Sequence, residues 1–302
     1  MSRKRKGDIV NGWVVLDKPA GLGSTTAVSI VRRLFNAQKA GHAGTLDPAA
    51  SGVLPIALGE ATKTIPYVMD GEKRYAFTVR FGQATDTDDA EGSIIAETDV
   101  LPSKEEVLKV LPLFIGEIEQ IPPKYSAIHV DGKRAYDLAR NQQEVVLQPR
   151  RIRVDNLRLI EPFDARNACF EVDCGKGTYV RSLARDIAEK VGSLGHVTSL
   201  RRLKCAKFST ENAFLLEYLR SIEHSSNWTG VLLPVETVLD DIPALAVTRE
   251  QAAKLSNGNF LPTSFFPDVP AVEVFQAKLD NRLIALVRVR DEMIRPVRLI
   301  NQ

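Results

Sequence analysis

The chain has 302 residues, of which 44% are hydrophobic and 26% are charged. These fractions are ordinary for a folded globular protein and exclude extensive disorder or a fibrous design. The net charge of +2 is nearly neutral, so affinity for a polyanion would have to come from local clustering of the 40 basic residues.

Other features of the sequence exclude further classes of protein. Cys169, Cys174 and Cys205 are too few and wrongly spaced for a zinc ribbon, and their odd number does not fit a disulfide framework. The basic segment 2–6 has no apolar stretch behind it, which excludes a secretory signal. No window approaches the roughly 18 consecutive apolar residues of a membrane span. We therefore expect a cytoplasmic protein that does not contact a membrane.

The N-terminal part of the chain predicts a strand, a helix and a glycine-rich loop. The apolar run 13–16 is typical of a strand and ends at a Pro/Gly loop. Ser24 is a candidate cap for a helix that follows it, because apolar residues recur there at helical spacing. The segment Gly41–Pro48 is dense in turn-forming residues, so we expect Asp47 on a loop.

Two further elements carry candidate functional residues. The alternation from Tyr75 to Phe81 predicts a half-buried strand with Tyr75 on its apolar face. Downstream, a strand-like run leads through Gly175-Lys176-Gly177 into a strongly periodic helix, with Arg181 in its first turn. This short glycine–lysine segment lacks the spacing of a nucleotide phosphate loop, because Gly177 stands where the hydroxyl residue belongs.

The C-terminal part predicts a separate, smaller unit. Periodicity weakens between residues 234 and 243, and a capping-box pattern then begins a new helix at Thr248. Apolar runs at 271–275, 283–289 and 294–300 predict short strands. We expect a basic N-terminal arm over residues 1–10, a large domain over 11–240 and a small β-rich domain over 241–302.

Each candidate residue also has an ordinary structural explanation. Asp47 before Pro48 could simply begin a turn, and His42 could be a surface histidine in a loop. Tyr75 could be a plain sheet aromatic, and Arg181 a surface charge. The four histidines show no metal-binding spacing, so we expect no metal site. No cofactor motif is present.

Several segments become informative when they are read together. The segment Gly41–Pro55 closely resembles the catalytic motif of bacterial tRNA pseudouridine-55 synthases, the TruB family. Segments similar to that family follow in the same order, and the resemblance extends from about residue 12 to residue 203. These segments are Gly59-Glu60-Ala61-Thr62-Lys63, Lys73-Arg74-Tyr75, Thr85-Asp86-Thr87-Asp88, Tyr125-Ser126-Ala127 and Lys176-Gly177-Thr178-Tyr179-Val180-Arg181-Ser182-Leu183.

The resemblance implies a fold and an activity. The fold would be α+β, with a pseudouridine synthase domain around a central, mainly antiparallel or mixed sheet, followed by a small β-rich PUA-like RNA-binding domain. The activity would be isomerisation of the T-loop uridine at position 55 of tRNA to pseudouridine, without a cofactor and with the base flipped out of the RNA. Asp47 would be the essential aspartate, Arg181 its partner and Tyr75 the aromatic that packs against the target base.

The same resemblance implies residues that bind substrate. His42 matches the residue that occupies the space left by the flipped base, and Leu200 matches an apolar position near the base. Arg201 and Arg202 are suited to phosphates. Tyr179 and Lys18 lie in segments that match the family and are also expected to bind substrate. Gly23 stands where the family usually has a hydroxyl residue, so a local hydrogen bond is expected to be absent.

The chemistry of Asp47 follows only in part from the sequence. An arginine beside this carboxylate is expected to lower its pKa and keep it ionised. An ionised carboxylate could add to the base, attack the sugar carbon or abstract a sugar proton. We expect a monomer that binds the T-arm stem-loop of tRNA without an obligatory protein partner. The alternatives are a non-catalytic RNA-binding or RNA-folding protein, and a pseudouridine synthase for another RNA.

Overall fold

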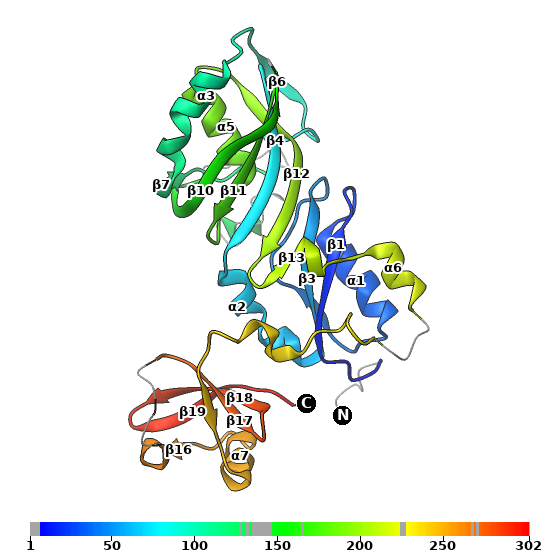
Figure 1. Cartoon of the computed structure of the whole chain (residues 1–302), viewed down its shortest axis with the longest axis vertical. Coiled ribbons are helices and arrows are strands. Elements are labelled where there is room, and N and C mark those ends of the chain that lie inside the picture. Colours follow the sequence, from blue (N-terminus) through cyan, green and yellow to red (C-terminus); the bar gives the residue numbers. More distant parts are fainter. Residues whose placement is uncertain are drawn as a thin grey trace.

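The computed structural model describes residues 7–126, 129–130, 133–134, 147–164, 166–223, 228–266, 269 and 272–301. Within these residues the chain forms a long mixed sheet that carries most of the molecule and a separate small sheet near the C-terminus (Figure 1). Helices and strands are interspersed throughout, and most neighbouring strands are antiparallel. The predicted α+β fold with a mainly antiparallel or mixed sheet is confirmed.

The large sheet of the described chain has ten strands in the order β14-β1-β3-β12-β4-β11-β10-β7, with β2 paired to β3 and β13 paired to β12. Two of its pairings, β1 with β14 and β3 with β12, are parallel. The strands are β1 (Gly12–Lys18), β2 (Ala40–His42), β3 (Ser51–Leu58), β4 (Lys73–Phe81), β7 (Gly116–Gln120), β10 (Arg150–Phe163), β11 (Asn167–Cys174), β12 (Gly195–Cys205), β13 (Phe208–Ser209) and β14 (Phe214–Leu215).

Helices cover this sheet, and short hairpins lie in the loops between its strands. Apolar residues of α5 pack with β4, β10 and β11 in one buried cluster, while α1 and α6 lie beside β1 and β3 in another (Figure 1). The helices are α1 (Ser24–Leu34), α2 (Ile65–Asp70), α3 (Lys104–Val110), α5 (Val180–Lys190) and α6 (Leu216–Ser221), with 3₁₀ helices at Gly59–Lys63, Leu111–Phe114, Thr210–Asn212 and Val235–Val238. Two short hairpins are β5 (Gln83–Thr85) with β6 (Ile94–Glu97), and β8 (His129–Val130) with β9 (Lys133–Arg134).

Strand β12 brings distant parts of the chain together. It pairs with β4 so that Arg202 lies opposite Tyr75, and with β3 so that Arg202 lies opposite Gly52. Gly52 has a φ of +101°, and a Cβ there would lie 2.2 Å from the carbonyl oxygen of Arg202. Only glycine permits this close approach. The loop that precedes β3 and contains Asp47 is thereby held beside Tyr75.

The small sheet has the strand order β15-β17-β18-β19-β16 and packs against one helix. Its elements are β15 (Ala244–Ala246), α7 (Arg249–Ser256), β16 (Leu261–Pro262), a 3₁₀ turn (Thr263–Phe265), β17 (Phe275–Leu279), β18 (Arg282–Arg290) and β19 (Met293–Leu299). The last two predicted strands form close to their expected positions. The first begins only at Phe275, because its partner β15 pairs with residues 276–278. Residues 270–271 lie outside the described ranges.

Polar contacts and a shared apolar cluster join the two sheets. The Lys63 ammonium group donates to the carbonyl of Leu299 at 2.8 Å, and the Glu60 carboxylate accepts from the backbone N–H of Asn301 at 2.7 Å. Leu283 and Leu286 of the small sheet lie in the same buried cluster as Trp13 of β1. The division at residue 240 stays a prediction.

The N-terminal arm is described only in part, because residues 1–6 lie outside the described ranges. The backbone N–H of Asp8 donates to the carbonyl of Asn36 at 2.6 Å, and Val10 is buried against α1. The described residues 7–10 therefore pack onto the large domain. No helix among the described residues is both long and apolar enough to span a membrane.

Candidate active site

A cavity of about 470 Å³ lies where the loop before β3, strands β4 and β12, and the start of α5 meet. Its volume is within the usual range of small-molecule sites, about 300–1,000 Å³. Five of the predicted site residues line it, namely Asp47, Tyr75, Tyr179, Arg181 and Leu200. His42 and Lys18 are not among its lining residues.

Asp47 and Arg181 form an ion pair in this cavity. The Nε of Arg181 lies 3.0 Å from Oδ2 of Asp47. The Asp47 side chain remains 39% exposed, whereas that of Arg181 is only 6% exposed. The buried guanidinium group therefore fixes one side of the carboxylate, and the other side is open to the cavity.

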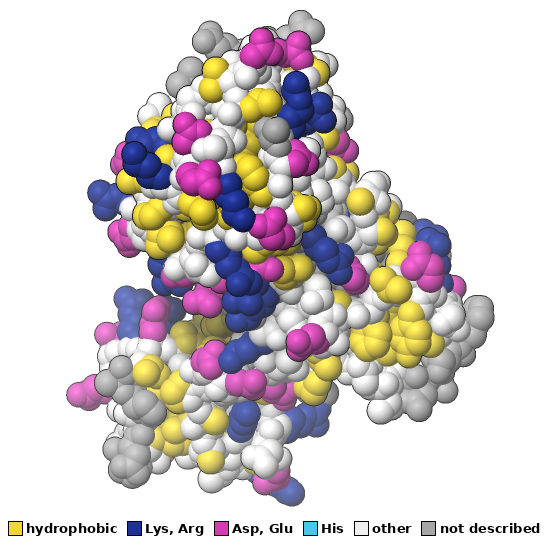
Figure 2. Space-filling model, turned by 45° about the horizontal axis from the view of Figure 1, so that its top comes forward, with side chains coloured by type: hydrophobic (Ala, Val, Ile, Leu, Met, Phe, Trp, Pro, Cys, Tyr) yellow, Lys and Arg dark blue, Asp and Glu magenta, His cyan; other side chains and the backbone are white. Residues whose placement is uncertain are grey.

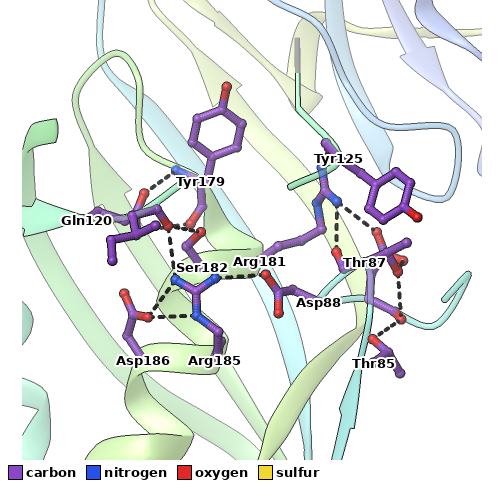
Figure 3. A network of polar contacts seen from close by, with 12 residues as sticks. Thr85, Thr87, Asp88, Gln120, Tyr125, Tyr179, Arg181, Ser182, Arg185 and Asp186 are labelled. Atoms are coloured by element: carbon purple, nitrogen blue, oxygen red, sulfur yellow. Dashed lines mark hydrogen bonds and ion pairs between the residues drawn. The ribbon is translucent and has the colours of Figure 1, made fainter. Parts of the chain in front are cut away.

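Arg181 is itself held by backbone carbonyls of two other loops (Figure 3). Its Nη1 donates to the carbonyl of Thr87 and its Nη2 to the carbonyl of Tyr125, both at 2.9 Å. A second carboxylate, Asp89, lies 3.4 Å from Nη1 and is 10% exposed. The guanidinium group thus has partners on all its nitrogens, which fixes its orientation toward Asp47.

The sequence did not identify Asp89. Asp89 directly follows the segment Thr85-Asp86-Thr87-Asp88. The sequence shows that several carboxylates are close together there, but it does not show which of them faces Arg181. In the folded loop, Asp88 instead pairs with Arg185 at 2.9 Å (Figure 3). The Asp89 carboxylate accepts from the Thr87 hydroxyl at 2.5 Å and from the backbone N–H of Glu91 at 3.0 Å.

The pKa of Asp47 is set by opposing effects of burial and of the neighbouring charges. Loss of solvent around the carboxyl group raises the pKa of Asp47 above its usual value, and the nearby Asp89 adds to this. Arg181 and Lys18 lower it, as expected for cations, but they do not outweigh the desolvation. The expected direction of the Arg181 effect is therefore confirmed: the guanidinium group lowers the pKa of Asp47 in a pocket that otherwise favours the neutral acid.

Ser24 and Gly21 both hold the loop that carries Asp47. The Ser24 hydroxyl accepts from the backbone N–H of Leu46 at 2.9 Å and donates to its carbonyl at 2.8 Å. The backbone N–H of Gly21 donates to the carbonyl of Pro48 at 2.8 Å. Ser24 is thus not the predicted helix cap. The cap position is Gly23, which offers no side-chain hydrogen bond to the start of the helix.

Lys18 lies beneath the same loop and is fully buried. Its ammonium group donates to the carbonyls of Pro19 at 2.9 Å, Leu22 at 2.6 Å and Pro48 at 3.2 Å. Burial lowers the pKa of Lys18 to about 8, although Asp47 acts in the opposite direction. Lys18 therefore lies outside the lining of the cavity, and all three of its N–H groups donate to loop carbonyls.

Tyr75, Leu200 and Tyr179 form apolar and aromatic walls of the cavity. Tyr75 and Leu200 pack against both buried clusters of the large sheet. Burial raises the pKa of Tyr75 to about 12, so its hydroxyl stays neutral at ordinary pH. Tyr179 precedes α5, and its backbone is held by the Gln120 side chain through bonds of 2.8 and 3.2 Å (Figure 3).

The predicted phosphate contacts of Arg201 and Arg202 are not supported by their surroundings. Arg202 is 1% exposed, and its guanidinium group donates to the carbonyls of Val53 at 2.7 Å and Gly44 at 3.1 Å. Arg201 forms a bidentate pair with Asp17, with bonds of 2.9 and 2.7 Å. For Arg202 the expectation is wrong, because the side chain is committed to the backbone beneath the cavity.

His42 lies at the end of β2, just before the loop that lines the cavity. Its Nδ1 is buried without a hydrogen-bond partner among the described residues. Desolvation, assisted by the charge of Arg202, lowers the pKa of His42, which favours a neutral ring. A neutral, partly buried imidazole suits stacking against a base more than ion pairing with a phosphate.

Two family models match consecutive parts of the chain. Residues 32–180 match the N-terminal domain of TruB family pseudouridylate synthases, and residues 181–240 match the C-terminal domain of tRNA pseudouridylate synthase B. The chain is also 50% identical over 305 aligned residues to tRNA pseudouridine synthase B of Caulobacter vibrioides, covering 99% of this chain and 98% of the relative. The chain belongs to the TruB family. It is therefore a pseudouridylate synthase, an isomerase.

Other TruB family members show similar identity along the whole chain. The tRNA pseudouridine synthase B of Bradyrhizobium diazoefficiens is 50% identical over 297 residues, covering 97% of this chain and 86% of the relative. That of Roseobacter denitrificans is 47% identical and covers 100% of this chain and 99% of the relative. These relatives extend over residues 241–302, which neither family model covers.

Solved structures share the TruB family fold at lower identity. A chain from a Cbf5-Nop10-Gar1 complex has a TM-score of 0.73 and 24% identity, covering 97% of this chain and 85% of the other. A chain from the archaeal box H/ACA sRNP Nop10-Cbf5 complex has a TM-score of 0.73 and 21% identity, covering 100% and 93%. The coverage shows that both the large sheet and the small sheet belong to the shared fold.

Proposed function

We propose that this TruB family member isomerises the T-loop uridine at position 55 of tRNA to pseudouridine, with Asp47 as its catalytic group. Relatives that are 50% identical over nearly the full chain are named tRNA pseudouridine synthase B, and this name supports tRNA as the substrate. One structural observation carries the assignment of Asp47. Its carboxylate is the acid that the Arg181 guanidinium group presents to the open cavity.

The cavity supports a flipped base as the reacting group. A uridine within a folded RNA arm is inaccessible to a carboxylate, so the nucleotide has to leave the stack before it reacts. Tyr75 and Leu200 provide an aromatic and an apolar wall against which a base can pack. Tyr179 lines the same cavity, and His42, at its approach, is suited to fill the space that the base leaves.

The reaction requires that Asp47 be ionised, whichever of its three chemical routes operates. Arg181 supplies the positive charge that opposes desolvation of this carboxylate. Lys18 adds a second cation and holds the adjacent loop. We further propose that residues 11–240 form the catalytic domain and that residues 241–302 form a small domain that grips the tRNA.

The test is release of tritium from a T-arm stem-loop RNA that carries the label at C5 of its uridines, with no metal or nucleotide added. We expect release by the native protein and none by Asp47→Asn, which keeps the shape of the side chain but not its charge. Asp241→Asn is a matched control, because that side chain is 83% exposed and pairs with Lys207 at the surface. It should release tritium normally.

Each other outcome would overturn a different part of this proposal. Equal release by Asp47→Asn would remove Asp47 from the reaction. No release by the native protein despite tight, salt-sensitive binding would favour a non-catalytic RNA-binding protein. Release from ribosomal RNA in preference to tRNA stem-loops would identify a different substrate.

A further inference from the structure

An exposed ion pair joins two elements that both line the cavity. The Lys176 ammonium group lies 2.8 Å from Oδ1 of Asp70. Lys176 belongs to the loop between β11 and α5, and Asp70 is the last residue of α2. Their side chains are 69% and 62% exposed, and both residues line the cavity. None of the proposed chemistry uses this pair.

The other cations of the cavity are already committed to partners within the protein. Among the described lining residues, Lys73, Arg181 and Arg202 are each no more than 7% exposed. Lys73 donates to the carbonyls of Met69 and Gly71, and the two arginines donate to carbonyls of neighbouring loops and strands. Of the cations described along the cavity, Lys176 alone has an exposed side chain of its own. Exposed ion pairs are weak and exchange readily.

We propose that Lys176 binds a backbone phosphate of the RNA strand whose nucleotide enters the cavity, and that Asp70 pairs with Lys176 until that phosphate replaces it. This inference rests on the proposed function, because a flipped nucleotide remains linked to its strand by phosphodiesters at the cavity mouth. Lysine binds phosphate as a compact point charge. Asp70 is then an internal competitor for the same ammonium group.

The loop around Lys176 is open to the approach of a strand. Gly177 has a φ of +83°, and a Cβ there would meet nothing within 4 Å, so space lies above the backbone. Gly175, on the other side of Lys176, packs against Arg153, whose Cβ would lie 3.5 Å from a Cβ at this position, so the open space is on the Gly177 side. The spacing of Gly175-Lys176-Gly177-Thr178 excludes a nucleotide phosphate loop, yet its one cation is positioned for a single phosphodiester.

A neighbouring ion pair provides a matched control. Arg153 of β10 lies 3.4 Å from Glu72, with side chains 54% and 60% exposed, and it also pairs with Asp155 at 2.9 Å. This pair also connects the region after α2 to the β10–β11 side of the sheet, but neither residue lines the cavity. In the space-filling view, Lys and Arg side chains alternate with Asp and Glu across the middle of the molecule (Figure 2). Surface charge alone therefore does not distinguish Lys176.

The experiment measures equilibrium binding of the T-arm stem-loop over a series of salt concentrations, in an Asp47→Asn background that prevents turnover. For each phosphate that the protein no longer neutralises, the slope of log K against log salt falls by about 0.7–0.9. We expect Lys176→Gln to show this smaller slope and about three- to tenfold weaker binding at moderate salt. Asp70→Asn should bind about two- to fivefold more tightly, because the competitor is gone. Arg153→Gln should keep the parent slope.

A Lys176→Gln slope equal to that of Arg153→Gln would overturn the proposal, as would weaker binding by Asp70→Asn. These outcomes are separable from failure of the proposed function, which is measured by tritium release with Asp47 intact. A protein that binds RNA with the expected slopes but releases no tritium would retain the phosphate contact and lose the catalytic assignment.

Discussion

The basic residues around the cavity fall into two groups with different surroundings. Lys18, Arg181 and Arg202 are buried, and their N–H groups end on backbone carbonyls or on a carboxylate at the cavity. Lys176 and Arg74 are exposed and pair with surface carboxylates. Buried cations need such partners to offset their desolvation, so their loss disturbs the structure around them. Exposed cations remain available to an external anion.

This difference shows that charge near an RNA-modifying site is not a reliable guide to RNA contact. Arg202 lies in a basic segment and was expected to meet phosphates, yet it joins β3 and the Asp47 loop beneath the cavity. If burial defines the two groups, substitutions in the first should alter stability or catalysis strongly. Substitutions in the second should alter RNA affinity slightly or not at all.

The largest effect is expected for Arg181→Met. The substitution removes the donor that orients Asp47 and leaves the Asp47 and Asp89 carboxylates near each other without their shared cation. We expect kcat to fall by about 10³-fold, or about 4 kcal/mol, with a smaller change in RNA affinity. Arg185→Met is the control, because it removes an arginine from the next turn that pairs with Asp88. Equal losses in both variants would contradict a specific role for Arg181.

Arg202→Met should mainly reduce stability. It removes the side-chain donor to Val53 and Gly44 at a site with 1% exposure, where uncompensated polar groups are costly. We expect the free energy of unfolding in urea to fall by about 3 kcal/mol. Arg201→Met, which removes an intermediate-exposure pair with Asp17, should lose less. A variant at position 202 with native stability and weaker RNA binding would return Arg202 to the phosphate-contact group.

Lys18→Met should have the next largest effect. The substitution preserves much of the apolar stem but removes the three bonds that link residues 19, 22 and 48. We expect a loss of about 2 kcal/mol in stability and a lower kcat, because the loop next to Asp47 loosens. Binding of the stem-loop RNA distinguishes the two interpretations of this residue. An unchanged Kd indicates a positioning residue, whereas a weakened Kd with native stability indicates direct contact with substrate.

The pH dependence of the native enzyme should reveal a smaller effect of the same buried environment. Desolvation raises the pKa of Asp47, and only the ionised carboxylate is active, so activity is lost as pH falls through this raised pKa. We expect the acid limb of kcat/KM to lie above the ordinary range of an aspartate. Residual activity of Arg181→Met should show that limb at still higher pH, because a cation that lowers the pKa is gone. A limb at lower pH in that variant would contradict the assignment.

The sequence predicted those features of the site that depend on local patterns. Turn-forming residues placed Asp47 on a loop, alternation placed Tyr75 on a strand, and helical periodicity placed Arg181 in a first turn. It did not predict partners that depend on distant segments. Arg202 meets Gly44 across 158 positions in the chain, and Ser24 holds Leu46 across 22. Nothing in the local pattern around either residue states which carbonyl it will meet.

The smallest effect is expected for Arg74→Gln, which tests whether burial or proximity in sequence is the better guide. Arg74 directly precedes Tyr75 on β4, but successive side chains of a strand point to opposite faces. Its side chain is 46% exposed and pairs with Asp173 on the neighbouring strand at 2.6 Å. Hydrogen bonding to Asp173 raises the pKa of Arg74, so the side chain stays charged. Exposed pairs contribute little, so we expect stability within about 0.5 kcal/mol of native and unchanged tritium release. A large loss of activity would mean that exposed cations also position the site, and burial would no longer separate the two groups.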